Sequence, residues 1–167
     1  NNAKVLEFHE LDSRIRVATA GSSSGSRGSE LAFLHFSEVA HWGSGAQELL
    51  TSALNCVPDV SGTSVIFEST ANGIGGAFHQ KWVECSRYYE MYVGECGAIS
   101  YRERENEGAD ISNTYSGIFI PWYVFRSYRR EVGMWFERTT EEEELSARYG
   151  LDDEQLSWRR YIISNKL

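Results

Sequence analysis

The sequence of 167 residues has no long apolar run and few histidines and cysteines. No run approaches the ~18 apolar residues that a membrane-spanning helix needs, so we expect no membrane contact. Its four histidines form no HExxH motif, which argues against a zinc enzyme. Its three cysteines, Cys56, Cys85 and Cys96, are odd in number and lack metal-ligand spacing, which favours free thiols in a reducing compartment.

Basic residues are fewer than acidic ones, 16 Lys and Arg against 24 Asp and Glu. The formal net charge of −8 argues against a wholly basic nucleic-acid-binding surface, although it permits local basic patches. No signal peptide is visible at Asn1, and the sequence begins without Met, so we expect a fragment or a processed product. The length is enough for one core, or for one domain with an appendage.

The middle of the sequence alternates between strand and helix patterns. Residues 31–36 and 63–67 are short apolar runs, and we expect both to be strands buried on both faces of a parallel sheet. Residues 46–55 place four apolar side chains on one helix face, and a second helix is expected from 75 to about 87. This order is typical of an α/β domain.

The flanking segments carry weaker patterns. Residues 5–8 and 14–19 predict a β-hairpin, and residues 116–124 predict an edge strand that is limited by Pro121. Residues 102–110 are charged and are expected to form an exposed loop. Two helices are expected near the end: one over 140–149, capped by Thr140 and ended by Gly150, and one over 153–165, capped by Asp152.

Polar side chains follow both predicted central strands. Glu38 comes after the first, and Ser69, Thr70 and Asn72 come after the second. Since parallel strands end at one edge of a sheet, we expect these groups to lie together. Glu38 suits a Walker-B-like acid that activates a water for attack on a phosphoryl group, or it merely caps a turn. The second group suits contact with a phosphate or water, or ordinary turn chemistry.

Four segments in order resemble a known family: HFSEVAHW, SVIFESTANGIGGAFHQKW, GIFIPWYVF and GLDDEQLSWRR. They are similar to the ATPase domain of the large terminase subunit of tailed phages and prophages, over nearly the whole chain. The resemblance implies a P-loop NTPase-like fold of the additional-strand class, with a mainly parallel sheet flanked by helices. It implies a partial ATPase core at 1–124 and a helical lid or linker subdomain at 125–167.

The resemblance also implies an activity and partners. The activity is ATP hydrolysis with Mg²⁺, which drives double-stranded DNA into procapsids. The full-length protein would form a homo-oligomeric ring in the host cytoplasm at the procapsid portal vertex, with the portal protein and the small terminase subunit as partners.

The resemblance assigns roles to individual residues. Glu38 matches the catalytic glutamate, and Ser69-Thr70-Ala71-Asn72 matches the coupling motif that links the γ-phosphate state to domain movement. Arg27 lies in the Gly/Ser-rich loop before the first central strand, where some relatives carry an arginine finger that acts on the neighbouring subunit. Ser37 stands where the commoner motif has Asp, so we expect it to hold magnesium only through water.

Some parts of the family pattern are missing. No GxxxxGK[ST] occurs in these 167 residues, and residues 73–76 are no substitute because no Lys-Ser/Thr pair follows them. The RNase-H-like nuclease domain is absent too. We therefore expect the phosphate cradle upstream of Asn1 and expect this chain to be inert alone.

Two alternative functions stay open. One is a non-catalytic subunit- or DNA-interaction module. The other is a two-metal nuclease built from Glu38 and Glu68, which lacks a clear third acid.

Basic and aromatic residues gather towards the end of the sequence. The basic ones form two clusters: Arg126, Arg129 and Arg130, and then Arg159 and Arg160. Either they are solvated helix faces paired with acids, or they contact DNA phosphates or the next subunit. Three tryptophans, Trp122, Trp135 and Trp158, are expected in the core rather than as base-stacking platforms, since duplex packaging does not require unstacked bases.

Overall fold

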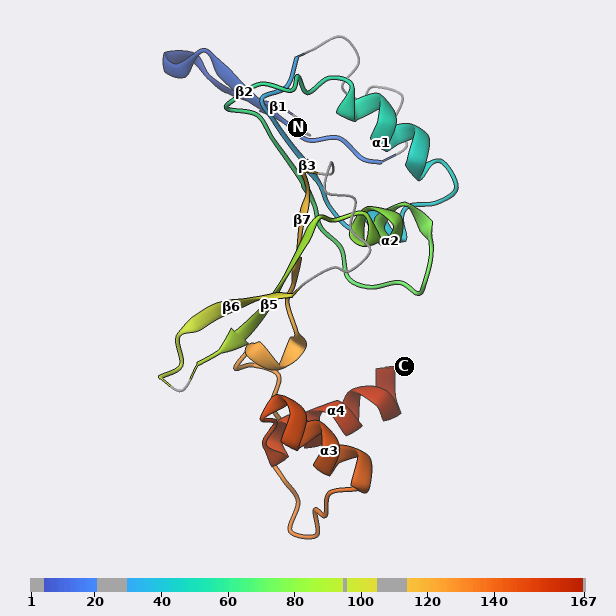
Figure 1. Cartoon of the computed structure of the whole chain (residues 1–167), viewed down its shortest axis with the longest axis vertical. Coiled ribbons are helices and arrows are strands. Elements are labelled where there is room, and N and C mark those ends of the chain that lie inside the picture. Colours follow the sequence, from blue (N-terminus) through green and yellow to red (C-terminus); the bar gives the residue numbers. More distant parts are fainter. Residues whose placement is uncertain (1–4, 21–29, 95, 105–113, 167) are drawn as a thin grey trace. The chain divides into compact units, whose positions relative to one another are not determined.

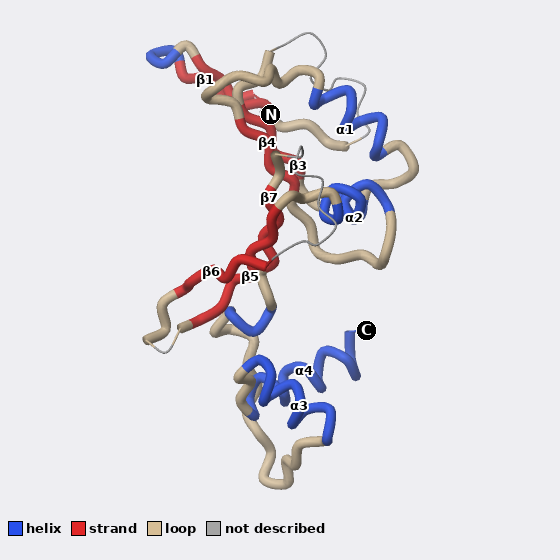
Figure 2. The backbone as a smooth tube through the Cα atoms, viewed as in Figure 1, coloured by secondary structure: helices blue, strands red, loops and turns tan. Residues whose placement is uncertain are grey.

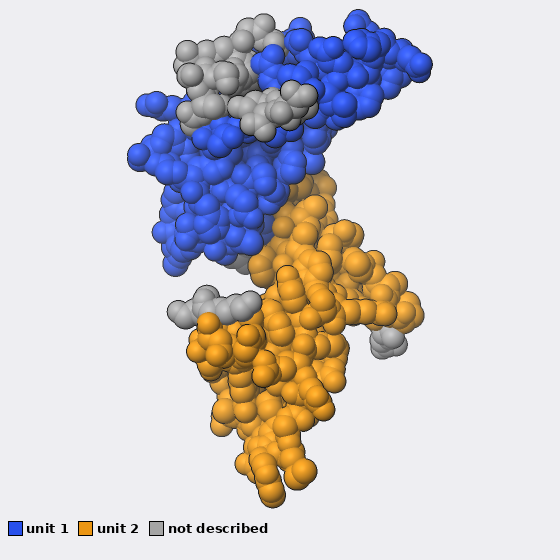
Figure 3. Space-filling model, turned by 180° about the vertical axis from the view of Figure 1, so that it is seen from behind, with its two compact units in different colours: residues 1–84 blue, residues 85–167 orange. Residues whose placement is uncertain are grey.

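The computed structural model describes residues 5–20, 30–94, 96–104 and 114–166 (Figure 1). Across these residues it is a mixed α/β structure with three small sheets and four α-helices (Figure 2). The chain divides into two compact units, residues 1–84 and 85–167 (Figure 3). The division predicted at 124–125 lies within the second unit and, as a functional division, stays a prediction.

The first unit is organised around two parallel strands. Strand β3 (Phe33–Phe36) pairs with β4 (Ser64–Phe67), and helix α1 (Ala46–Leu54) lies between them in the sequence. The predicted strands, their parallel pairing and this helix are therefore confirmed. The core consists of Phe36, Val39 and Leu50, and the Leu50 side chain is fully buried.

The prediction that both faces of these strands are buried is wrong. Leu34 and Phe36 pack towards α1 and α2 (Gly76–Val83), which lie on the same side of the strands (Figure 1). On the other face, Phe33 is 58% exposed and Ile66 is 46% exposed. Side chains alternate along a strand, so helices on one face alone leave every second residue uncovered.

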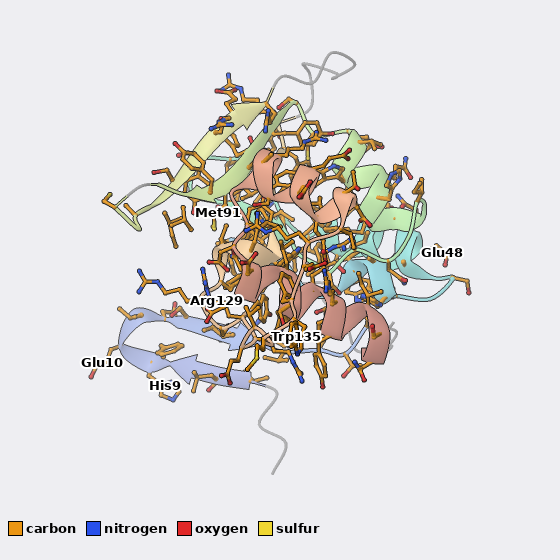
Figure 4. All side chains as sticks on the ribbon, turned by 90° about the horizontal axis from the view of Figure 1, so that it is seen from below. His9, Glu10, Glu48, Met91, Arg129 and Trp135 are labelled. Carbon is orange, nitrogen blue, oxygen red and sulfur yellow. The ribbon has the colours of Figure 1, made fainter. Side chains whose placement is uncertain are left out.

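The first unit also contains the predicted hairpin, and its second helix is shorter than predicted. Strands β1 (Val5–Phe8) and β2 (Ser13–Arg16) form the predicted antiparallel hairpin, joined by the 3-10 turn η1 (His9–Leu11), and all their residues are exposed. Figure 4 shows His9 and Glu10 at the tip of this hairpin. Helix α2 ends at Val83, four residues earlier than predicted, because the following chain enters a strand.

The second unit contains a mixed sheet in the order β6–β5–β7. Central strand β5 (Arg87–Val93) is antiparallel to β6 (Ile99–Arg104) and parallel to β7 (Ser116–Phe119). The expectation of a mainly parallel sheet is thus wrong, since two of the four strand pairs are antiparallel. The connections explain this, because a short turn can join only antiparallel neighbours.

Residues 102–104 were expected in a loop and lie in β6 instead. The charged side chains there are accommodated by cross-strand pairing, since Arg104 Nε donates to Glu90 Oε2 at 3.1 Å across the sheet. Strand β7 is an edge strand, as predicted, and Pro121 follows it before the 3-10 turn η3 (Trp122–Val124).

Two capped helices complete the second unit. Helix α3 (Thr140–Tyr149) has the predicted bounds, but its N-cap is Thr139 rather than Thr140. Thr139 Oγ1 accepts from the Glu142 amide at 3.3 Å, while the Thr139 amide donates to Glu142 Oε2 at 2.8 Å. This reciprocal pair needs an acid three residues after the cap, which selects Thr139. Gly150 ends the helix in a left-handed conformation.

Helix α4 (Asp153–Lys166) begins after a second reciprocal cap. Asp152 Oδ1 accepts from the Gln155 amide at 3.0 Å, and the Asp152 amide donates to Gln155 Oε1 at 3.1 Å. The predicted cap is confirmed. None of the helices in the described part of the chain is long and apolar enough to cross a bilayer.

Candidate functional site

Glu38 has an unusual backbone conformation at the end of β3. Its φ of 56° and ψ of 38° lie in the left-handed region, which residues other than glycine rarely adopt. It starts the 3-10 turn η2 (Val39–His41), which the His41 amide closes by donating to the Glu38 carbonyl at 3.0 Å. Such a conformation costs on the order of 1–3 kcal/mol, so surrounding contacts must hold it.

The segment after β4 holds the backbone of this turn. The Val39 amide donates to the Glu68 carbonyl at 3.2 Å, and the Ala40 amide donates to Ser69 Oγ at 3.0 Å. Asn72 Nδ2 donates to the Ala40 carbonyl at 3.1 Å. Ser69 and Asn72 therefore use their side chains to fasten the turn that carries Glu38.

The Glu38 carboxylate itself is held mainly by Thr70. Glu38 Oε2 accepts from Thr70 Oγ1 at 3.2 Å and from the Thr70 amide at 3.4 Å. Ser69 Oγ lies 3.5 Å from the same oxygen, but its hydroxyl has one proton and a shorter bond to the Thr70 carbonyl at 2.9 Å. As expected, the two groups lie together: Ser69 and Thr70 contact the Glu38 carboxylate, whereas Asn72 bonds the Ala40 carbonyl of the same turn.

His41 belongs to the same group, although the sequence reasoning missed it. Its Nε2 lies 2.8 Å from Thr70 Oγ1 and 3.7 Å from Glu38 Oε2. A signal was available, because residues three apart lie on the same side of a 3-10 turn and His41 is three residues after Glu38. The side chains of Glu38 and His41 are 54% and 47% exposed, so a water or a ligand can reach them.

Ser37 lies beside this group but does not join it. Its carbonyl accepts from Trp42 Nε1 at 3.0 Å, and its side chain is exposed. The described residues contain no cluster of three or more His, Cys, Asp or Glu that would bind a metal directly. Mg²⁺ commonly keeps several waters and binds phosphates. Water-mediated contact between Ser37 and Mg²⁺ therefore stays a prediction. Arg27, the predicted arginine finger, is outside the described residues.

Glu68 points to a different partner from Glu38. Its Oε1 lies 3.7 Å from His35 Nε2, whereas Glu38 lies near His41. A two-metal nuclease needs several acids around shared ions, and no such group occurs in the part of the chain that the structure describes. The geometry gives no support to the nuclease alternative.

A cavity of about 550 Å³ lies near this site but is separate from it. It is lined by residues of α1 and α2 and of the segments that precede them, among them Ser44, Gln47, Gly76 and His79. Glu38 and Thr70 are not in its lining, so the cavity does not enclose the candidate carboxylate.

The basic clusters of the second unit are largely paired with acids. Arg129 Nη1 lies 2.5 Å from Asp152 Oδ2, and Arg159 Nη2 lies 2.5 Å from Glu141 Oε1. Arg160 pairs with the buried Glu142, and Arg130 stacks over the Tyr161 ring at 4.3 Å. These contacts favour pairing with acids over contact with phosphates. Only Arg159 and Arg160 lie on a helix face, because Arg129 and Arg130 are in the irregular segment between η3 and α3.

The tryptophans divide into two kinds. Trp158 stacks on Trp122 at 5.0 Å and on Tyr128 at 4.7 Å, as expected of packed residues. Trp135 is 90% exposed, so its placement in the core is wrong. It sits in the segment before α3, where Met134 is equally exposed and Phe136 instead packs under Arg160.

Comparison with known proteins gives no relative. No protein-family profile, no curated protein and no solved structure matches this chain.

Proposed function

We propose that this chain is part of the ATPase domain of a terminase large subunit, with a P-loop NTPase-like fold of the additional-strand class. The observation that supports it best is the contact between two strand ends. Glu38 Oε2, after β3, accepts two hydrogen bonds from Thr70, after the parallel neighbour β4. Ligands of open α/β sheets bind at this edge, where packing requires no carboxylate.

In this proposal Glu38 orients and activates the water that attacks the γ-phosphoryl group of ATP. Thr70 donates to one carboxylate oxygen, which leaves the other free to accept a proton from water. Mg²⁺ would neutralise charge on the phosphates, held through water by Ser37. The phosphate cradle comes from residues outside this sequence, and Arg27 acts on the neighbouring subunit.

Ser69, Thr70 and Asn72 couple hydrolysis to movement in the same proposal. Ser69 and Asn72 bond the backbone of the η2 turn, and Thr70 bonds the carboxylate. A shift of the segment after β4 on loss of the γ-phosphate would therefore move Glu38 as well. This mechanical link supports the role that the family resemblance implies.

The proposed motor acts on double-stranded DNA within a ring of identical subunits. Its partners are the portal protein and the small terminase subunit, and its place is the procapsid portal vertex in the host cytoplasm. The family resemblance alone supports these assignments. Since carboxylates already pair Arg129, Arg159 and Arg160, we place no DNA contact on these three residues.

The test begins with the reading frame upstream of the Asn1 codon. We expect GxxxxGK[ST] in frame there, and we expect the protein extended to include it to hydrolyse ATP. Glu38→Gln in that protein should lower kcat at least about a hundredfold, because it removes the group that takes the proton from water. Glu68→Gln is the matched control, since Glu68 ends the neighbouring strand and contacts a different histidine.

Two results would count against the proposal. A reading frame that starts near Asn1 without the phosphate-binding motif would favour the non-catalytic interaction module. Equal ATPase rates for Glu38→Gln and the unsubstituted protein would show that the acid has no catalytic role. The 167-residue chain by itself should hydrolyse ATP no faster than its Glu38→Gln variant.

A further inference from the structure

We propose that His41 is a positioning residue for Glu38 and acts through the Thr70 hydroxyl. The imidazole fixes the direction of that hydroxyl, and the hydroxyl fixes the carboxylate. The proposal rests on the proposed function only in taking Glu38 as the group that acts on water. Its geometric part stands on the contacts among three side chains and can be tested without any ATPase assay.

The distances distinguish a direct contact from an indirect one. His41 Nε2 lies 2.8 Å from Thr70 Oγ1, which is within hydrogen-bond distance. The same nitrogen lies 3.7 Å from Glu38 Oε2, which is beyond hydrogen-bond distance. Thr70 Oγ1 bridges this gap, since it lies 3.2 Å from Glu38 Oε2. His41 therefore reaches the carboxylate through Thr70.

The position of the His41 ring proton decides whether the Thr70 hydroxyl can donate to Glu38. Thr70 Oγ1 has one proton and can donate it once. When His41 Nε2 carries a proton and donates to Thr70, the hydroxyl proton is free for Glu38. When Nε2 is unprotonated and accepts from Thr70, Glu38 loses that donor and keeps the Thr70 amide at 3.4 Å as its partner on this residue. An ionised acceptor makes the stronger hydrogen bond, so the first arrangement is favoured.

The fold brings His41 to this position without using it for packing. The left-handed backbone of Glu38 starts the η2 turn, which returns the chain to the side of the carboxylate after three residues. Val39 fills the core from the same turn and is 1% exposed, whereas the His41 side chain is 47% exposed. Replacing His41 should therefore alter the carboxylate while leaving the core intact.

The first experiment reads the His41 ring directly in the 167-residue chain. Long-range ¹H–¹⁵N NMR should show the proton on Nε2, and Thr70→Val should shift the His41 ring signals and the balance of its tautomers. Thr70→Ser keeps the hydroxyl and should restore the original signals. His35 is the internal control, because it faces Glu68 and should not respond. An unchanged His41 spectrum in Thr70→Val would overturn the proposal.

The second experiment measures activity in the protein extended by its upstream residues. His41→Ala should lower kcat about tenfold or more with little change in KM, since a misplaced catalytic group slows the chemical step. His41→Gln offers an amide N–H in a similar position and should recover part of the loss. His35→Ala is the control and should leave kcat unchanged.

The outcomes separate this inference from the proposed function. If Glu38→Gln abolishes hydrolysis but His41→Ala does not lower kcat, the positioning role fails and the motor proposal stands. If Glu38→Gln has no effect, the motor proposal fails, and the NMR result alone decides the geometric part.

Discussion

Two carboxylates, one in each compact unit, are held in opposite ways. In the first, Glu38 is 54% exposed and is held by a hydroxyl and an amide of Thr70. In the second, Glu142 is only 2% exposed, and both its oxygens accept from Arg160, at 2.6 and 2.5 Å. A carboxylate paired with a guanidinium has little capacity left for a ligand, whereas one held on one side by neutral donors keeps free lone pairs.

The surroundings of two groups in the second unit shift their pKa values strongly. The Arg160 guanidinium, helped by the Thr139 amide and opposed by burial, lowers the pKa of Glu142 to about 2. In the same unit, burial together with the nearby Glu90 raises the pKa of Tyr123 to about 12. Both groups thus keep one protonation state over the ordinary pH range. Contacts within the folded unit account for both shifts, so a shifted pKa does not by itself mark a catalytic site.

The largest expected effect comes from the core beneath the candidate site. Leu50→Ala removes a fully buried side chain that packs with Phe36 and Val39, and it should cost about 2–5 kcal/mol of unfolding free energy. Amide hydrogen exchange in α1 and β3 is the measurement. Ile15→Ala on the exposed hairpin is the control and should change little. Equal effects of the two substitutions would mean that the first unit does not pack as described.

The next effect tests the buried pair of the second unit. Arg160→Met should cost about 2 kcal/mol at neutral pH, between the values for surface and buried pairs, because Glu142 would be left buried without its cation. Glu142 is charged in the folded state above pH about 2 and in the unfolded state above about 4.5. The stability it contributes is therefore full above 4.5 and is lost as pH falls towards 2.

Denaturant unfolding of the Arg160→Met variant at several pH values measures this loss. Its deficit relative to the unsubstituted protein should shrink as pH falls from 4.5 to 2. Arg159→Met is the matched control, since its partner Glu141 is 66% exposed and the pair should contribute well under about 1 kcal/mol. A deficit independent of pH would assign the effect to lost packing against Phe136 instead.

The smallest expected effect on stability tests which residue is the N-cap of α3. Thr139→Ala removes the side-chain acceptor for the Glu142 amide and should cost about 1 kcal/mol. Thr140→Ala, one residue later, should be close to neutral, because Thr140 is already inside α3. Thermal unfolding followed by circular dichroism compares the two. The reverse order would restore Thr140 as the cap.

Sequence reasoning worked best where one simple pattern dominated. The apolar runs predicted β3 and β4, and the rule that parallel strands end at one edge predicted that Glu38 would meet Ser69, Thr70 and Asn72. It failed where charged residues enter strands. Residues 102–104, the Arg-Glu-Arg at the end of β6, were expected to be in a loop, although Gly94 and Gly97 mark the turn that closes the hairpin.

Other features depended on contacts that no local pattern records. His41 was missed because its role follows from a turn conformation and from a partner 29 residues away. The exposure of Phe33 and Ile66 depends on which elements cover the second face of the sheet. Trp135 was assigned to the core because duplex packaging needs no base-stacking platform, and that argument does not record what surrounds the residue. The partners of a side chain and the elements that cover a sheet face depend on the folded structure, whereas periodicity can be read from the sequence.

The left-handed backbone at Glu38 sets a limit on how this protein can be engineered. Asparagine or glycine would suit that conformation better than glutamate does. Either replacement would relax the turn and at the same time delete the acid that Thr70 holds. A search for stabilising variants that ranks this position by thermal tolerance alone would therefore select against the residue on which the proposed chemistry depends.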